Sequence, residues 1–289
     1  MFFPVFPLTR FLTMNTAPTN TLLGKATEYV DTYQPKLLTP IPRYLGRGAL
    51  AGNVPFKGVD IWRLYEVTWL NEYGLPQAAA GEIHVPAASP SIVESKSLKL
   101  YIGSLTQSVF PSLSTVENII ARDVGQVVGE TVTVKLFPIG QWHQSAVDFE
   151  GVVLEEEYSG DRLFRDYEVN PALLAHDPAT VTVKETLVSH LLRSRCPVTG
   201  QPDFASVRIE YEGAKIDHTA LLAYIVSYRR HQGFHEQCVE SIYTDIMLRL
   251  KPASLSVYGA FTRRGGIDIS PFRSTTLTAP EAVIRVSRQ

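Results

Sequence analysis

The sequence predicts an α+β fold made of two tandem β-β-α-α-β-β modules, each an antiparallel sheet with its helices on one face. Three segments recur at one constant offset of 123 residues: 98–104 at 221–227, 116–119 at 239–242, and 131–134 at 254–257. Matches that stay in register without a gap indicate an internal duplication. Strand and helix periodicities also follow the same order in both copies.

Each copy is expected to open with two strands. Residues 61–70 and 182–192 have the pattern of first strands, and residues 81–87 and 205–211 that of second strands. Polar and apolar residues alternate along the second strands, which is typical of an antiparallel sheet with one buried face.

Two helices follow in each copy. The earlier helix is expected over 95–105 in the first copy and over 218–230 in the second. The later helices are indicated by apolar residues at helical spacing: Val116, Ile119, Ile120, Val124 and Val127, and then Val239, Ile242, Tyr243, Ile246 and Leu250. Ser114 and Glu117 have the spacing of a capping box and predict where the first of these later helices begins.

Two closing strands complete each copy, near 131–137 and 149–154 in the first and near 254–261 and 266–272 in the second. The chain then divides into five parts: an N-terminal extension and irregular lead-in (1–55), the first module (56–155), a linker (156–180), the second module (181–276) and a C-terminal tail (277–289). Two prolines interrupt the apolar start, so we expect residues 1 to about 20 to be dispensable rather than a signal peptide.

Composition excludes several classes of protein. The net charge is −2 and no broad basic field exists, so nucleic acid is not an expected partner. No apolar run reaches the roughly 18 residues that a membrane span needs, so no membrane partner is expected either. With only 2 cysteines, a disulfide framework is excluded and a reducing, cytoplasmic location is expected.

Cys196 stands between an apolar strand and a turn that contains Pro197 and Gly200. A free cysteine is often only a small buried hydrophobic residue. Here the strand end favours access, and the nearby Arg193 and Arg195 would favour the thiolate. If the chain folds back at the turn, Asp203 comes opposite Cys196, as a proton donor beside a nucleophile.

A helix begins near residues 234–238, with Glu236 in its first turn and Cys238 further along. A carboxylate in this position can be no more than a favourable helix start. The spacing of His231, His235 and Cys238, with Cys196 as a fourth ligand, also fits a zinc site. His231 is expected in the break before this helix, however, and a second cysteine pair is missing, so no metal is predicted.

Two further stretches suit an anionic ligand. The sequence ESKSLKLY (94–101) places serines and lysines at a predicted helix start, where phosphate commonly binds. The sequence RRGGID (263–268) forms a basic turn with two adjacent glycines. Either stretch can be an ordinary solvated element. A glycine-rich dinucleotide motif of the Rossmann type is absent from the sequence.

Taken together, these stretches closely resemble the NADPH-dependent 7-cyano-7-deazaguanine reductases, the nitrile reductases of the queuosine pathway, in their long two-module form. The resemblance extends over about residues 23–288 and rests on long motifs in a fixed order: VPFKGVDIW, ESKSLKLY, ETLVSHLLRSRCPVTGQPDFA, FHEQCVE and FTRRGGIDISPFRS. It implies tandem tunnelling-fold modules and a homodimer. It also implies reduction of the nitrile of 7-cyano-7-deazaguanine to the primary amine with two NADPH and no metal, a step toward a modified tRNA base.

The resemblance also implies a role for each residue that matches a motif. Cys196 would be the nucleophile that forms a covalent thioimidate, Asp203 the general acid, and His235 an active-site histidine that contacts substrate. The other matches are the substrate contacts Val93, Glu94, Ser95, His235 and Glu236, and the NADPH contacts Ser95, Lys96, Arg264 and Gly265. Two alternatives stay open: a zinc-dependent purine or pterin enzyme of the same fold, and a non-catalytic purine-binding protein.

Overall fold

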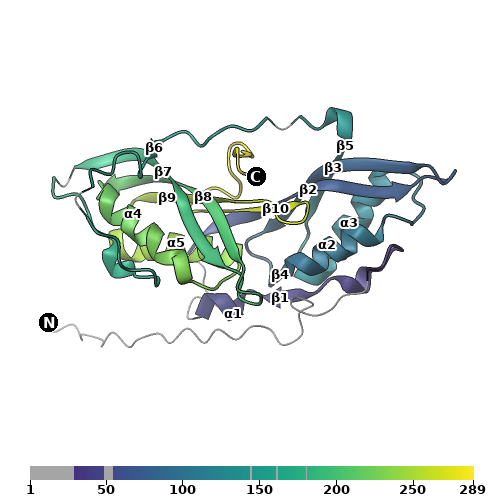
Figure 1. Ribbon diagram of the computed structural model, residues 1–289, viewed down its shortest axis with the longest axis horizontal. Helices are drawn as coiled ribbons and strands as arrows, with labels where there is room; N and C mark the ends of the chain where they lie inside the picture. The colour runs from purple at the N-terminus through teal and green to yellow at the C-terminus, as the bar shows by residue number, and fades with distance from the viewer. Residues whose placement is uncertain (1–28, 49–54, 144, 161, 180) are drawn as a thin grey trace.

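The computed structural model describes residues 29–48 and 55–289, except residues 144, 161 and 180. The N-terminal segment predicted to be dispensable lies outside these residues. Within them the chain forms an elongated α+β fold, with one long sheet whose lower face in Figure 1 is covered by helices. The mixed fold class predicted from the sequence is confirmed.

The long sheet has eight strands in the order β5-β3-β2-β10-β9-β8-β7-β6. Their bounds are β2 Lys57–Leu70, β3 Pro76–Pro86, β5 Thr133–Pro138, β6 Val152–Val153, β7 Thr182–Arg195, β8 Pro202–Ala214, β9 Ser254–Phe261 and β10 Ile267–Ser274. All neighbours are antiparallel except β6 and β7. One sheet therefore runs through both halves of the chain, instead of a separate sheet in each.

Two pairs of helices pack beneath the two ends of this sheet (Figure 1). The first pair is α2 (Ser95–Ser104) and α3 (Leu113–Val128), and the second is α4 (His218–Ser227) and α5 (His235–Leu250). Each pair buries its apolar face in a separate core under its own part of the sheet. The predicted helices are therefore present, although α4 ends earlier and a 3-10 helix, Tyr228–Arg230, follows it.

The last strand of each copy differs from the sequence prediction, because it pairs with a strand of the other half. Strand β6 is much shorter than expected and pairs in parallel with β7 of the second half. Strand β10 lies between β9 and β2, so it connects the second half to the first. Sequence periodicity indicates that a strand exists, but it does not say which edge the strand joins.

The N-terminus of α3 also differs from the prediction. Ser112, not Ser114, is the N-cap, and its hydroxyl accepts a hydrogen bond from the Thr115 amide at 3.1 Å. Glu117 instead accepts from the Leu136 amide of β5 at 2.7 Å. A glutamate three residues after a serine has the spacing of a capping box, but here a tertiary contact uses the carboxylate.

Two irregular segments complete the fold. In the lead-in, β1 (Pro40–Pro42) pairs with β4 (Ser91–Val93), and the short helix α1 (Tyr44–Arg47) packs against α5. The C-terminal segment lies on the face of the sheet opposite the helices, where Val286 joins a third apolar cluster with Val59 and Phe272.

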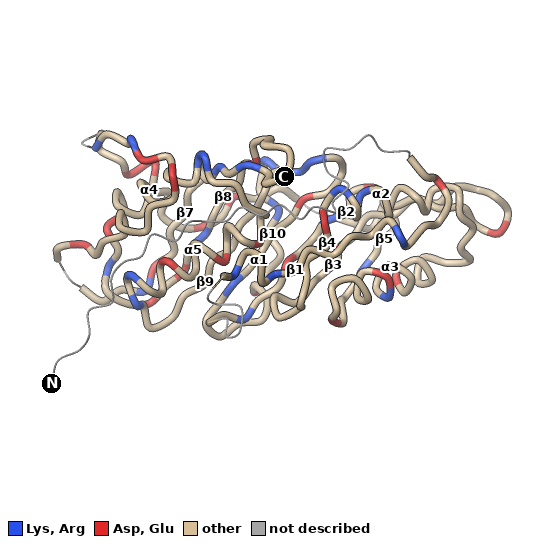
Figure 2. The backbone as a smooth tube through the Cα atoms, turned by 90° about the horizontal axis from the view of Figure 1, so that it is seen from below, with Lys and Arg blue, Asp and Glu red and all other residues tan. Residues whose placement is uncertain are grey.

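Lysines and arginines are interspersed with aspartates and glutamates over both halves of the molecule (Figure 2). The described residues contain no helix that is long and apolar enough to cross a membrane.

Candidate active site

The β7–β8 hairpin positions Cys196. The Cys196 amide donates to the carbonyl of Gln201 at 2.9 Å, and the Gly200 amide donates to the Cys196 carbonyl at 3.0 Å. Gly200 adopts a φ of +68°, which an L-residue with a side chain rarely takes. These bonds close a tight turn directly after the strand and hold the thiol, which is 4% exposed, in a pocket wall.

Asp203 lies on the same face of the hairpin as Cys196, but not directly opposite it as the sequence suggested. Its partner across the ladder is Ser194. Residues two apart share one face of a strand, so Cys196 and Asp203 are diagonal neighbours. The same alternation places Arg193 and Arg195 on the other face, so the expected support of these arginines for the thiolate stays a prediction without a contact behind it.

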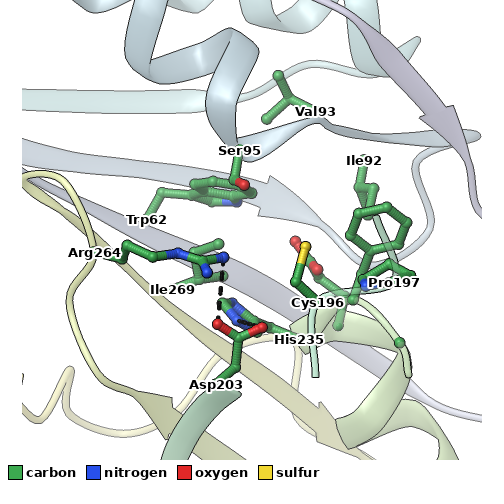
Figure 3. Close-up of a pocket in the computed structure, with 13 residues that line it drawn as sticks. Trp62, Ile92, Val93, Ser95, Cys196, Pro197, Asp203, His235, Arg264 and Ile269 are labelled. Carbon is green, nitrogen blue, oxygen red and sulfur yellow. Dashed lines mark ion pairs between the residues drawn. The ribbon is translucent and has the colours of Figure 1, made fainter. Parts of the chain in front are cut away.

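Asp203 makes two ion pairs inside the site (Figure 3). One joins its carboxylate to His235 Nε2 at 3.5 Å, and the other joins it to Arg264 Nη2 at 3.3 Å. The His235 ring stacks on Phe261 with 4.0 Å between centroids, which fixes the ring at the start of α5. The hairpin, the first turn of α5 and the β9–β10 turn therefore meet at one carboxylate.

Glu236 follows His235 and is only 2% exposed. Its Oε1 lines the pocket region without a hydrogen-bond partner among the described residues. Burial, and then the nearby negative charge of Asp60, raises the pKa of Glu236 to about 8. A buried acceptor without a hydrogen-bond partner lowers the stability of the fold unless a ligand supplies donors. This carboxyl group is therefore suited to binding a ligand.

The start of α2 forms the opposite side of the site. Val93 and Ser95 line the pocket, as predicted for substrate contacts, and Ser95 lies near Trp62 in Figure 3. Glu94 between them is fully buried and caps its own helix, accepting from the Lys96 and Ser97 amides at 2.8 Å each. The sequence suggested that the backbone amides of this helix start bind a phosphate. The amides of Lys96 and Ser97 instead donate to Glu94.

Glu94 keeps part of its capacity to bind a ligand. Its two oxygens accept one amide each, and an ionised carboxylate has about four lone-pair sites. Burial raises the pKa of Glu94, although the two amide hydrogen bonds oppose the shift. Within the described residues of one chain, the Glu94 side chain does not line the pocket beside Cys196.

The pocket lies between the start of α2, the β7–β8 hairpin and the start of α5. It brings together the predicted residues Val93, Ser95, Cys196, Asp203, His235, Glu236 and Arg264. It also contains apolar walls that sequence reasoning missed, among them Ile92, Pro197 and the cross-strand pair of Trp62 and Ile269. The motif VPFKGVDIW contained Trp62, but only the pairing of β2 with β10 reveals that it faces the site.

A second cavity adjoins the first and shares Ser95, His235, Arg264 and Ile269 with it. Lys96, Lys99 and Arg264 give its lining three cationic side chains and no carboxylate. Gly265 lies beside it with a φ of +64°, and a Cβ atom at this position would collide with Lys99. This lining fits a ligand that carries phosphate groups. Lys99 lies within the stretch ESKSLKLY (94–101), but it is not among the NADPH contacts that the resemblance implies.

The residues considered for zinc do not come together as ligands. His231 lies before α5, as expected, and packs edge-on against Tyr228, while His235 pairs with Asp203. Burial lowers the pKa of His231 to about 4 and raises that of Cys238 to about 12. Within the described ranges, no group of three or more His, Cys, Asp or Glu side chains is arranged to hold a metal ion.

Comparison with protein families gives two matches. Residues 29–136 match the family described as "Nitrile reductase, 7-cyano-7-deazaguanine-reductase N-term", and residues 202–279 match the family described as "QueF-like protein". The first match includes Val93, Glu94 and Ser95, and the second includes Asp203, His235 and Arg264. Cys196 itself lies between the two matched regions.

Curated relatives extend over nearly the whole chain. The NADPH-dependent 7-cyano-7-deazaguanine reductase of Burkholderia vietnamiensis is 49% identical over 279 residues, which is 94% of this chain and 99% of the relative. The protein of the same name from Burkholderia multivorans is 50% identical over 264 residues, or 89% and 94% of the two chains. A solved archaeosine synthase QueF-Like, in the apo form, is 20% identical and covers 35% of this chain and 98% of its own, with a TM-score of 0.28.

Proposed function

The chain belongs to the NADPH-dependent 7-cyano-7-deazaguanine reductases, and from this premise we propose that Cys196 is the nucleophile through which it reduces its substrate. The enzyme reduces the nitrile of 7-cyano-7-deazaguanine, with NADPH as reductant, in the biosynthesis of queuosine. The observation that best supports our assignment is the meeting of Cys196, Asp203, His235 and Glu236 in one pocket.

The first chemical step joins the enzyme to its substrate. An electron pair of the Cys196 sulfur forms the new bond to the nitrile carbon, and one π pair of the C≡N group moves onto nitrogen. Asp203 moves the thiol proton to the nitrile nitrogen, which gives a neutral thioimidate without net uptake of a proton. Its diagonal position on the hairpin, and its pairing with His235 and Arg264, support this role for Asp203.

The next steps reduce the same carbon twice. NADPH supplies the hydride in each of the two reductions. After the first reduction, Cys196 leaves as a thiolate, the carbon–sulfur bond breaks and an imine forms. His235, held against Phe261 and paired with Asp203, carries one proton to the nitrogen, and a second proton returns the Cys196 thiolate to the thiol, so that two hydrides and two protons give the primary amine.

Carboxylates and an aromatic wall would hold the base. A guanine-like edge presents adjacent N–H donors, which a carboxylate accepts in a paired geometry. Within the part of the chain that the structure describes, one acceptor oxygen of Glu236 has no partner and Glu94 retains free lone pairs for this purpose. Trp62 offers a flat apolar surface on which the ring system can stack.

The second cavity is the proposed NADPH site. Lys96 and Arg264, with Lys99 as an addition to the sequence prediction, would bind the phosphates, while Gly265 allows a close backbone approach. Ser95, His235 and Arg264 line both cavities, so a reductant bound here lies beside the substrate pocket.

We further propose the arrangement that the family resemblance implied. The two halves would be tandem tunnelling-fold modules with the domain boundaries given above, and two chains would form a homodimer in the cytoplasm without nucleic acid or membrane partners. The paired helices beneath each end of the sheet support the modular division. Ultracentrifugation at several protein concentrations tests the dimer.

The test compares the two cysteines. We expect wild-type protein with 7-cyano-7-deazaguanine to oxidise two NADPH per nitrile, and Cys196→Ala to lose this activity. Without NADPH, the wild-type protein should gain the mass of one substrate on Cys196. Cys238→Ala, a matched change of the buried cysteine, should keep both properties. A fully active Cys196→Ala variant would contradict the covalent mechanism, and absence of oxidation by folded wild-type protein would contradict the proposed reaction.

A further inference from the structure

A buried ion-pair cluster lies beside the pocket, where the two halves of the chain meet. At its centre, the Asp60 carboxylate of β2 contacts Arg43 Nη2 of the lead-in at 2.6 Å and Arg273 Nη1 of β10 at 2.8 Å. Asp60 and Arg273 are fully buried, and Arg43 is only 4% exposed. Burial raises the pKa of Asp60, but the two arginines outweigh it and lower the pKa below its ordinary value.

Glu240 of α5 completes the cluster. Its Oε1 lies 2.8 Å from Arg273 Nη2 and 2.8 Å from Arg47 Nη2, and it is also within 3.5 Å of Arg43 Nη1. We call Arg43, Arg47, Asp60, Glu240 and Arg273 the Asp60 cluster. Its three arginines, from the lead-in and from β10, are all paired with its two carboxylates.

The Asp60 cluster continues directly into the pocket. On β2, Asp60 shares a face with Trp62, which pairs with Ile269 in the pocket wall. On α5, Glu240 lies one helical turn after Glu236 and on the same face. Strand β2 and helix α5 therefore each carry a residue of the Asp60 cluster and a residue of the pocket on the same face.

We propose that Asp60 is a positioning residue for the reduction: by binding both Arg43 and Arg273, it keeps these guanidinium groups from pairing with Glu236. The Glu236 carboxyl group then stays available to the substrate. This inference rests on the proposed role of Glu236. Without the Asp60 carboxylate, Arg43 and Arg273 would share one remaining carboxylate of the cluster, Glu240, which also binds Arg47. The Oε1 of Glu236, which has no hydrogen-bond partner among the described residues, is then an available acceptor for them.

The electrostatic effect of each neighbour has a definite sign. The negative charge of Asp60 raises the pKa of Glu236, whereas Arg43 and Arg273 lower it. The other ionisable groups near Glu236, from the remaining elements around the pocket, are Cys196, Asp203, His235, Cys238, Glu240 and Arg264. Since none of these is changed by a substitution at Asp60 or Arg43, the two substitutions should shift the pKa of Glu236 in opposite directions.

The first experiment is Asp60→Asn, with kcat and KM measured for both substrates between pH 6 and pH 10. We expect KM for the nitrile to rise about tenfold or more, because Glu236 is diverted to an arginine, while KM for NADPH stays within about twofold. The midpoint of the pH profile of kcat/KM should move to lower pH. Asp60→Glu, which keeps the charge, should restore part of the nitrile affinity.

Asp268→Asn is the matched control. Asp268 is an equally buried aspartate on the same pair of strands and pairs with Arg63 at 3.2 Å, but on the opposite face of the sheet. Loss of a buried ion pair should destabilise both variants, yet only Asp60→Asn should shift the pH profile. Equal profiles in the two variants would overturn the proposal.

Two further measurements separate this inference from the proposed function. In a Glu236→Gln background, Asp60→Asn should cause little additional rise in KM, since both act on one group. If Glu236→Gln alone leaves KM for the nitrile unchanged, the proposed substrate role of Glu236 is contradicted, and with it the positioning role of Asp60. If Asp60→Asn does not fold, Arg43→Gln decides: a midpoint at higher pH supports the proposal, and an unchanged midpoint overturns it.

Discussion

Two cysteines occur in this chain, and their surroundings differ. Cys238 is fully buried within α5, and burial raises its pKa to about 12, so its thiol is inert. Cys196 lies at a strand end in the wall of a pocket that also contains an aspartate and a histidine. The same residue type is therefore a packing group in one place and a candidate nucleophile in the other.

The most testable single residue is Glu236, because its pKa of about 8 lies within the working range of most enzymes. If the carboxylate form accepts the N–H donors of the substrate, kcat/KM for the nitrile should rise with pH through about 8. Glu236→Gln should lower kcat/KM and flatten this rise. Steady-state kinetics over pH 6–10 measure both, with KM for NADPH as the control; an unchanged profile would contradict the role.

The same group should also influence stability. Its folded-state pKa lies above the ordinary value, so the protonated form stabilises the folded protein, and this contribution is lost as pH rises toward 8. We expect urea unfolding of Glu236→Gln to show a smaller decrease of the unfolding free energy between pH 5 and pH 9 than the wild type. An identical decrease would mean that Glu236 is not perturbed.

At the scale of elements, tight local geometry positions the chemistry. The β7–β8 hairpin aligns Cys196 with Asp203, and the first turn of α5 presents His235 and Glu236 to them. The start of α2 is different, because Val93 and Ser95 line the pocket while Glu94 between them uses its carboxylate to cap the helix. Each contribution thus comes from the end of an element, where side chains are not covered by regular packing.

The turn of the hairpin offers a sharp prediction. Gly200 has a φ of +68°, and a Cβ atom there would meet nothing within 4 Å, so any cost of substitution comes from the backbone conformation. Gly200→Ala should lower the unfolding free energy by about 1–2 kcal/mol, and kcat/KM for the nitrile should fall as Cys196 is displaced. Gly200→Asn should do less, since asparagine tolerates this conformation better. If urea unfolding showed equal decreases of the unfolding free energy for Gly200→Ala and Gly200→Asn, the explanation by backbone conformation would be contradicted.

At the scale of the whole molecule, the pairing of β2 with β10 makes one sheet out of two halves and creates the site between them. Trp62 comes from the first half, while Cys196, Asp203 and Glu236 come from the second. The face opposite the helices is covered by the C-terminal segment. There the Gln289 side chain accepts from Arg63 at 3.2 Å and donates to Ser270 at 3.0 Å and to the Phe261 carbonyl at 3.1 Å.

This contact predicts a global effect of one residue. Gln289 is only 3% exposed, so Gln289→Ala leaves buried donors and acceptors without partners and should lower the unfolding free energy by about 1–3 kcal/mol. Ser287→Ala, an exposed neighbour, should stay within about 0.5 kcal/mol. Thermal and urea unfolding of both variants provide the measurement, and equal stability would show that the tail contributes little.

The mixed fold class, most helices and strands, and the family whose motifs contain Cys196, Asp203, His235 and Glu236 could all be predicted from the sequence alone. Periodicity and motifs are local properties, so they can be recognised in short stretches of the sequence without knowledge of long-range contacts. The tertiary contacts were needed to show that β10 joins β2, that Glu94 caps α2, that Trp62 faces the pocket, and that Asp60 binds two arginines. These contacts join residues far apart in the chain, and no periodicity records them.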